Sequence, residues 1–177
     1  PITGFGSVIV GGVRYDDSGA EVLDDNGNRR SRNELKLGMV VQVDAGAVDA
    51  ASATALARRV RWANELVGPV GSINLGAATM QVLGQTVQVT SSTVFDSSLA
   101  GGLSALSAGA VVEVHGILDT ANVRIVATRI EPKTGATVYT LRGAVASLDI
   151  TAKTLRIGDA AISYAGLAAA DVPANLA

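Results

Sequence analysis

Few side chains in this sequence are of types that do catalytic chemistry, and His115 is the only histidine among them. It lies two positions after Glu113, so in a strand both side chains would project from the same face. A Glu–His pair can move a proton, but acid–base catalysis also needs a pocket and a third group that orients the base. The sequence places no serine or threonine beside this pair. We therefore expect a solvated histidine near a strand end, and a protein that is not an enzyme.

An acidic segment, Asp24-Asp25-Asn26-Gly27-Asn28, has the residue types of a calcium-binding loop. An EF-hand loop has glycine at its sixth position and an acid at its twelfth. Counted from Asp24, these positions hold Arg29 and Leu35. The same residue types are favoured in hairpin turns with positive φ, so the segment is predicted to be a turn.

The best candidate for ligand binding is the run Arg58-Arg59-Val60-Arg61-Trp62, which combines three arginines with the only tryptophan. Proteins that bind single-stranded nucleic acids combine basic grooves with aromatic stacking platforms. Strand alternation, however, places Arg59 and Arg61 on one face and Trp62 on the other. We expect surface ion pairs around a packed tryptophan, and we keep Arg59, Arg61 and Trp62 as candidate ligand-binding residues.

Composition narrows the function classes further. The net charge is −2, which gives no electrostatic reason to expect a nucleic acid partner. The chain has no cysteine, and a single histidine without cysteine is weak evidence for a metal site, so we expect no metal and no cofactor. No stretch reaches the roughly 18 to 20 apolar residues of a membrane-spanning helix.

The elements that must position these residues repeat along the chain. The segment Leu35–Val43 (LKLGMVVQV) returns as Leu106–Val114 (LSAGAVVEV), and the tail Ala57–Val60 returns as Ala127–Ile130. Such periodicity indicates copies of one small folding unit. Alternation of apolar and polar residues within each copy is typical of half-buried strands. It places Glu113 and Arg129 outside. The residues that it places inside are Met80, Val82, Val87, Val112, Val114 and Ile130.

The strand order predicts an all-β fold of tandem OB-like five-stranded barrels, two complete and a third partial. The expected modules are residues 1–66, 67–135 and 136–177. The expected strands are 6–10, 13–16, 20–23, 39–43 and 56–62 in the first module; 67–75, 79–83, 86–95, 110–116 and 124–131 in the second; and 140–149, 154–157 and 160–164 in the third. A short helix is expected within 97–106, weakened by Gly101 and Gly102, and an Ala-rich tail covers 166–177.

Three segments resemble a bacterial family of domains of unknown function: GFGSVIVGGVRYD (Gly4–Asp16), LKLGMVVQV, and ATRIE (Ala127–Glu131). The resemblance implies OB-like modules in tandem in exported proteins and lipoproteins, hence a periplasmic, outer-membrane-anchored or secreted location. It implies no catalytic residues, because the family has none established. The chain begins at Pro1 inside a repeat motif, as expected of a processed or trimmed N-terminus.

The leading functional expectation is a non-enzymatic structural or interaction module of an exported envelope protein, whose partner is a protein or another envelope component. The alternative is a module that binds an oligosaccharide or another small envelope ligand. Single-stranded nucleic acid binding ranks third. The partial third module would leave an apolar strand edge open, so we expect it to be covered by the second module, by further residues, or by strand exchange in a dimer.

Overall fold

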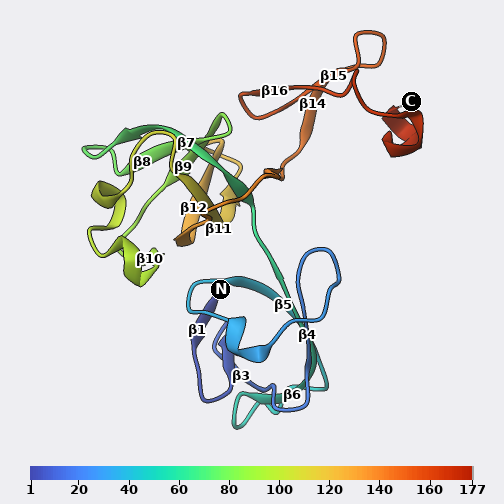
Figure 1. Ribbon diagram of the computed structural model, residues 1–177. Helices are drawn as coiled ribbons and strands as arrows, with labels where there is room; N and C mark the ends of the chain where they lie inside the picture. The colour runs from blue at the N-terminus through green and yellow to red at the C-terminus, as the bar shows by residue number, and fades with distance from the viewer. Residues whose placement is uncertain (177) are drawn as a thin grey trace.

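The computed structural model describes residues 1–176 and confirms the all-β fold class (Figure 1). The N-terminal unit holds β1 (Ile2–Gly4), β2 (Val8–Val10), β3 (Val13–Asp16), β4 (Glu21–Leu23), η1 (Arg32–Glu34), β5 (Val40–Ala45) and β6 (Thr54–Ala63). The central barrel holds β7 (Leu66–Asn74), β8 (Thr79–Val82), β9 (Gln85–Gln88), β10 (Val94–Phe95), η2 (Ser97–Leu99), η3 (Gly102–Ala105), β11 (Val111–Asp119) and β12 (Arg124–Pro132). After β13 (Thr140–Leu141), the C-terminal sheet holds β14 (Val145–Asp149), β15 (Thr154–Ile157) and β16 (Ala160–Ser163).

The central barrel is closed by its hydrogen-bonded strands. They follow the order β7-β8-β9-β12-β11, and β11 returns to β7. The pairs are antiparallel except β9 with β12, which is parallel. This is the order expected of an OB-type Greek-key barrel. Its core contains the apolar residues predicted to point inward: Met80, Val82, Val87, Val112, Val114 and Ile130.

Two expected elements of the central barrel are divided in the structure. The third strand was expected to run through 86–95, but it ends at Gln88, and a turn at Thr90–Thr93 leads to the short β10. The expected helix is two short 3₁₀ helices, η2 and η3, instead of one α-helix. Gly102, the first residue of η3, has φ +61°, so a continuous right-handed helix through 97–106 is interrupted there.

The N-terminal unit repeats the strand order of the central barrel. β1 pairs with β2, β2 with β3, β3 with β6 in parallel, and β6 with β5. Backbone bonds from Ile2 N to Met39 O and from Gly38 N to Ile2 O, both 2.9 Å, join β1 to the start of β5. The first strand was therefore assigned wrongly from the sequence: it is Ile2–Gly4, and Val8–Val10 is the second. The turn at Gly6, with φ +111°, separates them.

The expected third strand at 20–23 is also corrected. Its residues form β4, which pairs in parallel with β6 and occupies the same place as β10 beside β12. The third strand of the ring is β3 instead. This correction follows from the first one, because placing the first strand at Ile2–Gly4 makes Val8–Val10 the second strand and Val13–Asp16 the third, whereas β5 and β6 remain the fourth and fifth strands as expected.

The C-terminal sheet is an antiparallel meander of three strands, β14-β15-β16. The strand expected at 140–149 is interrupted, because Thr140 and Leu141 pair with β7 of the central barrel while β14 pairs with β15. Leu155 and Tyr164 are buried, but every residue of β14 is exposed. Ala177, the last residue of the expected Ala-rich tail, lies outside the described residues. None of the helices formed by residues 1–176 has the length and apolarity needed to cross a membrane.

Candidate functional site

The structure separates the ligand-binding residues proposed from the sequence. Trp62 is buried in the core of the N-terminal unit. Arg59 and Arg61 are exposed on the opposite face of β6. Arg59 forms ion pairs with Glu21 at 3.1 Å and with Asp44 at 3.6 Å. The indole ring and the two guanidinium groups therefore do not share one surface.

The acidic segment is a hydrogen-bonded turn around Asp24. One carboxylate oxygen of Asp24 accepts bonds from the backbone N–H groups of Asn26 and Asn28, both at 2.9 Å, and the other accepts from Arg30. Gly27 lies at φ +79°, as a turn of this type requires. Burial acts to raise the pKa of Asp24, but the bonds from Arg30, Asn28 and Asn26 outweigh it and lower the pKa to about 2.

The prediction of a solvated His115 is wrong. Its side chain is completely buried, and Glu113 and Arg129, also expected on the outside, are 3% and 5% exposed. All three do point away from the core of the central barrel. The N-terminal unit covers the face on which they lie, because Ala63 and the loop Leu35–Gly38 contact it. A side chain that points away from the core of one barrel can therefore still be buried by the neighbouring unit.

The register of β11 and β12 brings four polar side chains together on this covered face. Glu113 lies opposite Glu131, and His115 lies opposite Arg129. A bulge follows directly, because Gly116 pairs with Ala127 and leaves Thr128 unpaired in the ladder. We call Glu113, His115, Arg129 and Glu131 the buried polar block.

Cations compensate the two carboxylates of the block. Lys36 reaches Glu131 at 2.8 Å, and Arg129 bonds the same carboxylate through Nε at 3.0 Å and a terminal nitrogen at 2.9 Å. Lys133 pairs with Glu113. Burial acts to raise the pKa of Glu131, but the bonds from Lys36 and Arg129 overcome it and lower the pKa. Two glutamates facing each other across a ladder would repel, and these cations remove that penalty.

The histidine ring has one satisfied and one unsatisfied nitrogen. Nδ1 lies 2.9 Å from the backbone oxygen of Ala63 and must carry the proton, since a carbonyl oxygen only accepts. Nε2 is buried and has no hydrogen-bond partner within residues 1–176. Burial lowers the pKa of His115, although the charge of Glu113 opposes this shift. With Nδ1 as the donor, the neutral form of the ring has its lone pair on Nε2.

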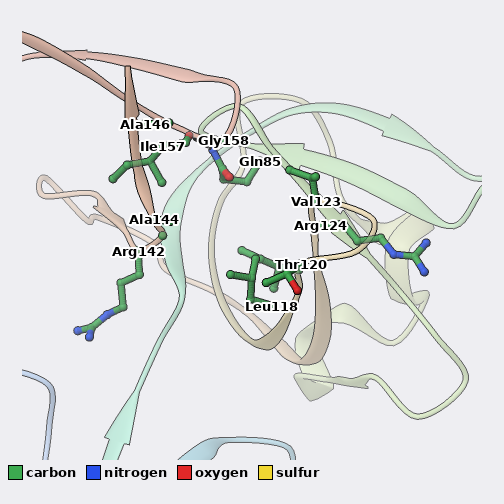
Figure 2. Close-up of a pocket in the computed structure, with 12 residues that line it drawn as sticks. Gln85, Leu118, Thr120, Val123, Arg124, Arg142, Ala144, Ala146, Ile157 and Gly158 are labelled. Carbon is green, nitrogen blue, oxygen red and sulfur yellow. Dashed lines mark hydrogen bonds between the residues drawn. The ribbon is translucent and has the colours of Figure 1, made fainter. Parts of the chain in front are cut away.

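A second feature is a groove between the central barrel and the C-terminal sheet, with a cavity of about 270 Å³. In Figure 2, Leu118 and Val123 from the β11–β12 hairpin lie on one side, and Ala146 and Ile157 lie on the other. The side chain of Gln85 bridges the two sides by donating to the Ile157 backbone oxygen at 2.6 Å. Sequence reasoning missed this groove, because no motif marks apolar residues that meet across two units.

Residues 67–131 match the family model described as Domain of unknown function (DUF5666). The resemblance to a family of unknown function expected from the sequence is confirmed over this segment. The DUF5666 match spans the central barrel from β7 into β12, so it contains the whole buried polar block and the barrel side of the groove. No curated protein and no solved structure matches the chain.

Proposed function

We propose that this chain is a non-enzymatic structural or interaction module of an exported bacterial envelope protein, built from tandem OB-like modules. Two are complete and the C-terminal sheet is part of a third. The shared strand order of the N-terminal unit and the central barrel supports this proposal, as does the recurrence of the L-x-x-G strand at Leu35 and Leu106. The location, periplasmic, outer-membrane-anchored or secreted, rests on the family resemblance alone.

The observation that carries the proposal is the use of polar side chains at the junction of the first two units. Arg129 of the central barrel donates to the backbone oxygen of Leu37, and Lys36 of the N-terminal unit pairs with Glu131. Gly38 fits so closely that an added Cβ would lie 2.4 Å from the Thr128 oxygen. Contacts of this kind fix two units against each other, which is what a scaffold or spacer needs.

Thermal unfolding of the whole chain with a panel of glycans and small metabolites tests this role. A structural module is expected to show the same melting temperature with every compound, because only a ligand that binds the folded state raises it. A saturable increase with one compound would replace the structural role by the second candidate. Recovery of the native protein in a cytoplasmic fraction of its host would overturn the proposed location.

The second candidate is binding of an oligosaccharide or another small envelope ligand, and the groove of Figure 2 favours it. Its lining is mainly apolar, and its polar residues are Gln85, Thr120, Arg124 and Arg142. Such a lining suits a ligand with an apolar face and a few hydroxyl groups. The variant Leu118→Lys should abolish a ligand-induced shift. The matched control Leu75→Lys, at a similarly exposed leucine outside the groove, should keep it.

A further inference from the structure

The buried polar block has a donor set that suits a metal ion. One carboxylate oxygen of Glu113, one of Glu131 and a ring nitrogen of His115 all lie within 4.8 Å of one another. All three residues are buried, at 3%, 8% and 0% exposure. Imidazole nitrogen and carboxylate oxygen are both ordinary zinc ligands, at bond lengths near 2.0 to 2.2 Å, and small side-chain movements would close the three atoms around one ion.

The histidine is oriented as metal-bound histidines usually are. Its Nδ1–H donates to the Ala63 carbonyl, which holds the ring in the tautomer with a free lone pair on Nε2. Nε2 lies 3.6 Å from Oε1 of Glu113, beyond hydrogen-bond distance, so these two buried polar atoms face each other without a hydrogen bond. A buried polar atom without a hydrogen bond is costly unless a cation or another partner satisfies it.

A second unsatisfied acceptor lies next to the block. Asn64 donates its amide N–H to the same Oε1 of Glu113 at 3.1 Å, while its own Oδ1 is buried without a partner within residues 1–176. The amide cannot be turned over to satisfy Oδ1, because this would point an oxygen at a carboxylate. Two buried acceptors beside the same carboxylate thus lack a cation or a donor.

Two lysines that pair with the carboxylates of the block leave an ion a route from the surface and a balanced charge. Lys36 and Lys133 contact the carboxylates from the surface, and their side chains are 44% and 49% exposed. Both ammonium groups can swing into water at little cost. A divalent ion that takes their place carries the same total charge of +2, so the charge balance with Arg129 and the two glutamates is unchanged.

We infer that Glu113, His115 and Glu131 bind a divalent zinc ion at the junction of the N-terminal unit and the central barrel. Glu113 and Glu131 each supply one oxygen and His115 supplies Nε2. Asn64 Oδ1 or a water molecule completes a four-coordinate site. The ion displaces Lys36 and Lys133 from the carboxylates. This inference goes beyond the proposed structural role, because it adds a ligand to the junction.

The single histidine makes the test direct, because the imidazole signals of the whole chain come from His115 alone. Zinc chloride is titrated into ¹⁵N-labelled protein, and the two ring nitrogens are followed by long-range ¹H–¹⁵N spectra. Binding should shift Nε2 strongly and leave Nδ1 as a protonated donor. The proposal is overturned if Nε2 keeps its metal-free shift at saturating zinc, and this readout needs no variant that must fold.

Variants then separate the block from adventitious surface binding. Glu131→Gln and His115→Gln remove one ligand each and should weaken zinc binding, measured by titration calorimetry, at least about tenfold. Lys36→Met removes a competitor for Glu131 and should tighten zinc binding, whereas Lys153→Met, at an exposed lysine of the C-terminal sheet, should not change it. Zinc affinity that is the same in all four variants would place the ion elsewhere and refute the site.

Discussion

Four equivalent ladder positions are exposed in the N-terminal unit and buried in the central barrel. On the outer face of β5 and β6, Gln42 lies opposite Arg61 and Asp44 lies opposite Arg59, and all four residues are exposed. On the outer face of β11 and β12 the corresponding residues form the buried polar block. The ladder geometry is the same in both. Only the neighbour differs, because the N-terminal unit covers the second face.

The two L-x-x-G loops differ in the same way. Gly38 and Gly109 end equivalent loops and have nearly equal φ angles, +83° and +86°. An added Cβ at Gly38 would collide with the Thr128 backbone, whereas one at Gly109 would meet nothing within 4 Å. The repeat therefore sets the turn, and the packing of units decides which copy becomes an interface.

The largest expected difference in stability comes from removing Arg129, the buried arginine of the block. Arg129→Ala removes two hydrogen bonds from the buried Glu131 carboxylate and leaves Lys36 as its remaining cation, so we expect a loss of about 3 kcal/mol in the free energy of unfolding, the lower end for a broken buried ion pair. The equivalent Arg59→Ala removes only exposed ion pairs and should cost less than about 1 kcal/mol. Urea unfolding followed by circular dichroism measures both. Equal losses in the two variants would mean that burial of the block does not increase the contribution of this arginine to the free energy of unfolding.

The two glycines form a matched pair for the interface itself. An alanine at either position is strained at positive φ, which costs about 1 to 2 kcal/mol. Gly38→Ala must also displace the Thr128 backbone, and forced packing of this kind adds about 1 to 3 kcal/mol. Thermal unfolding of both variants yields the difference. If Gly109→Ala destabilises the protein as much as Gly38→Ala does, the close contact at Gly38 contributes nothing to stability.

Acid titration should affect the N-terminal unit through its Asp24 turn. The pKa of Asp24 is lowered from 3.8 to about 2 in the folded chain. Its stabilisation is therefore complete above pH 4 and is lost as the pH falls towards 2. Fluorescence of Trp62, which lies in the same unit, reports this loss during acid unfolding.

Asp24→Asn is the control for this titration, because it keeps an acceptor oxygen but cannot ionise. Its stability should be lower at pH 7 and should change less between pH 4 and 2. An unchanged pH profile in this variant would assign the acid sensitivity to other carboxylates.

The junction with the C-terminal sheet should give the smallest effect. Gln85→Ala removes the hydrogen bond to Ile157, worth about 0.5 to 1.5 kcal/mol. We expect little change in the global melting temperature and faster amide exchange in β14–β16. The exposed Gln42→Ala in the N-terminal unit should leave that exchange unchanged. Equal exchange in the two variants would show that Gln85 does not hold the sheet.

The sequence alone predicted the barrel because its signals are local. Alternation within the expected strands 79–83, 86–95 and 110–116 identified the inward residues Met80, Val87, Val112 and Val114, and these are buried. Strand boundaries were predicted wrongly where a turn separates two strands, as at Gly6. A residue with positive φ can lie either in a bulge within one strand or in a turn between two strands, and the sequence does not distinguish the two.

What the sequence determined by itself is the repeat, the alternation and the side of the strand on which each residue lies. Tertiary structure decided which outer face meets solvent, because that depends on contacts such as Lys36 with Glu131, which are 95 residues apart. His115 shows the consequence. Its position outside the barrel core follows from the two-residue period, but its burial follows from the N-terminal unit that packs against it, and no local pattern encodes that packing.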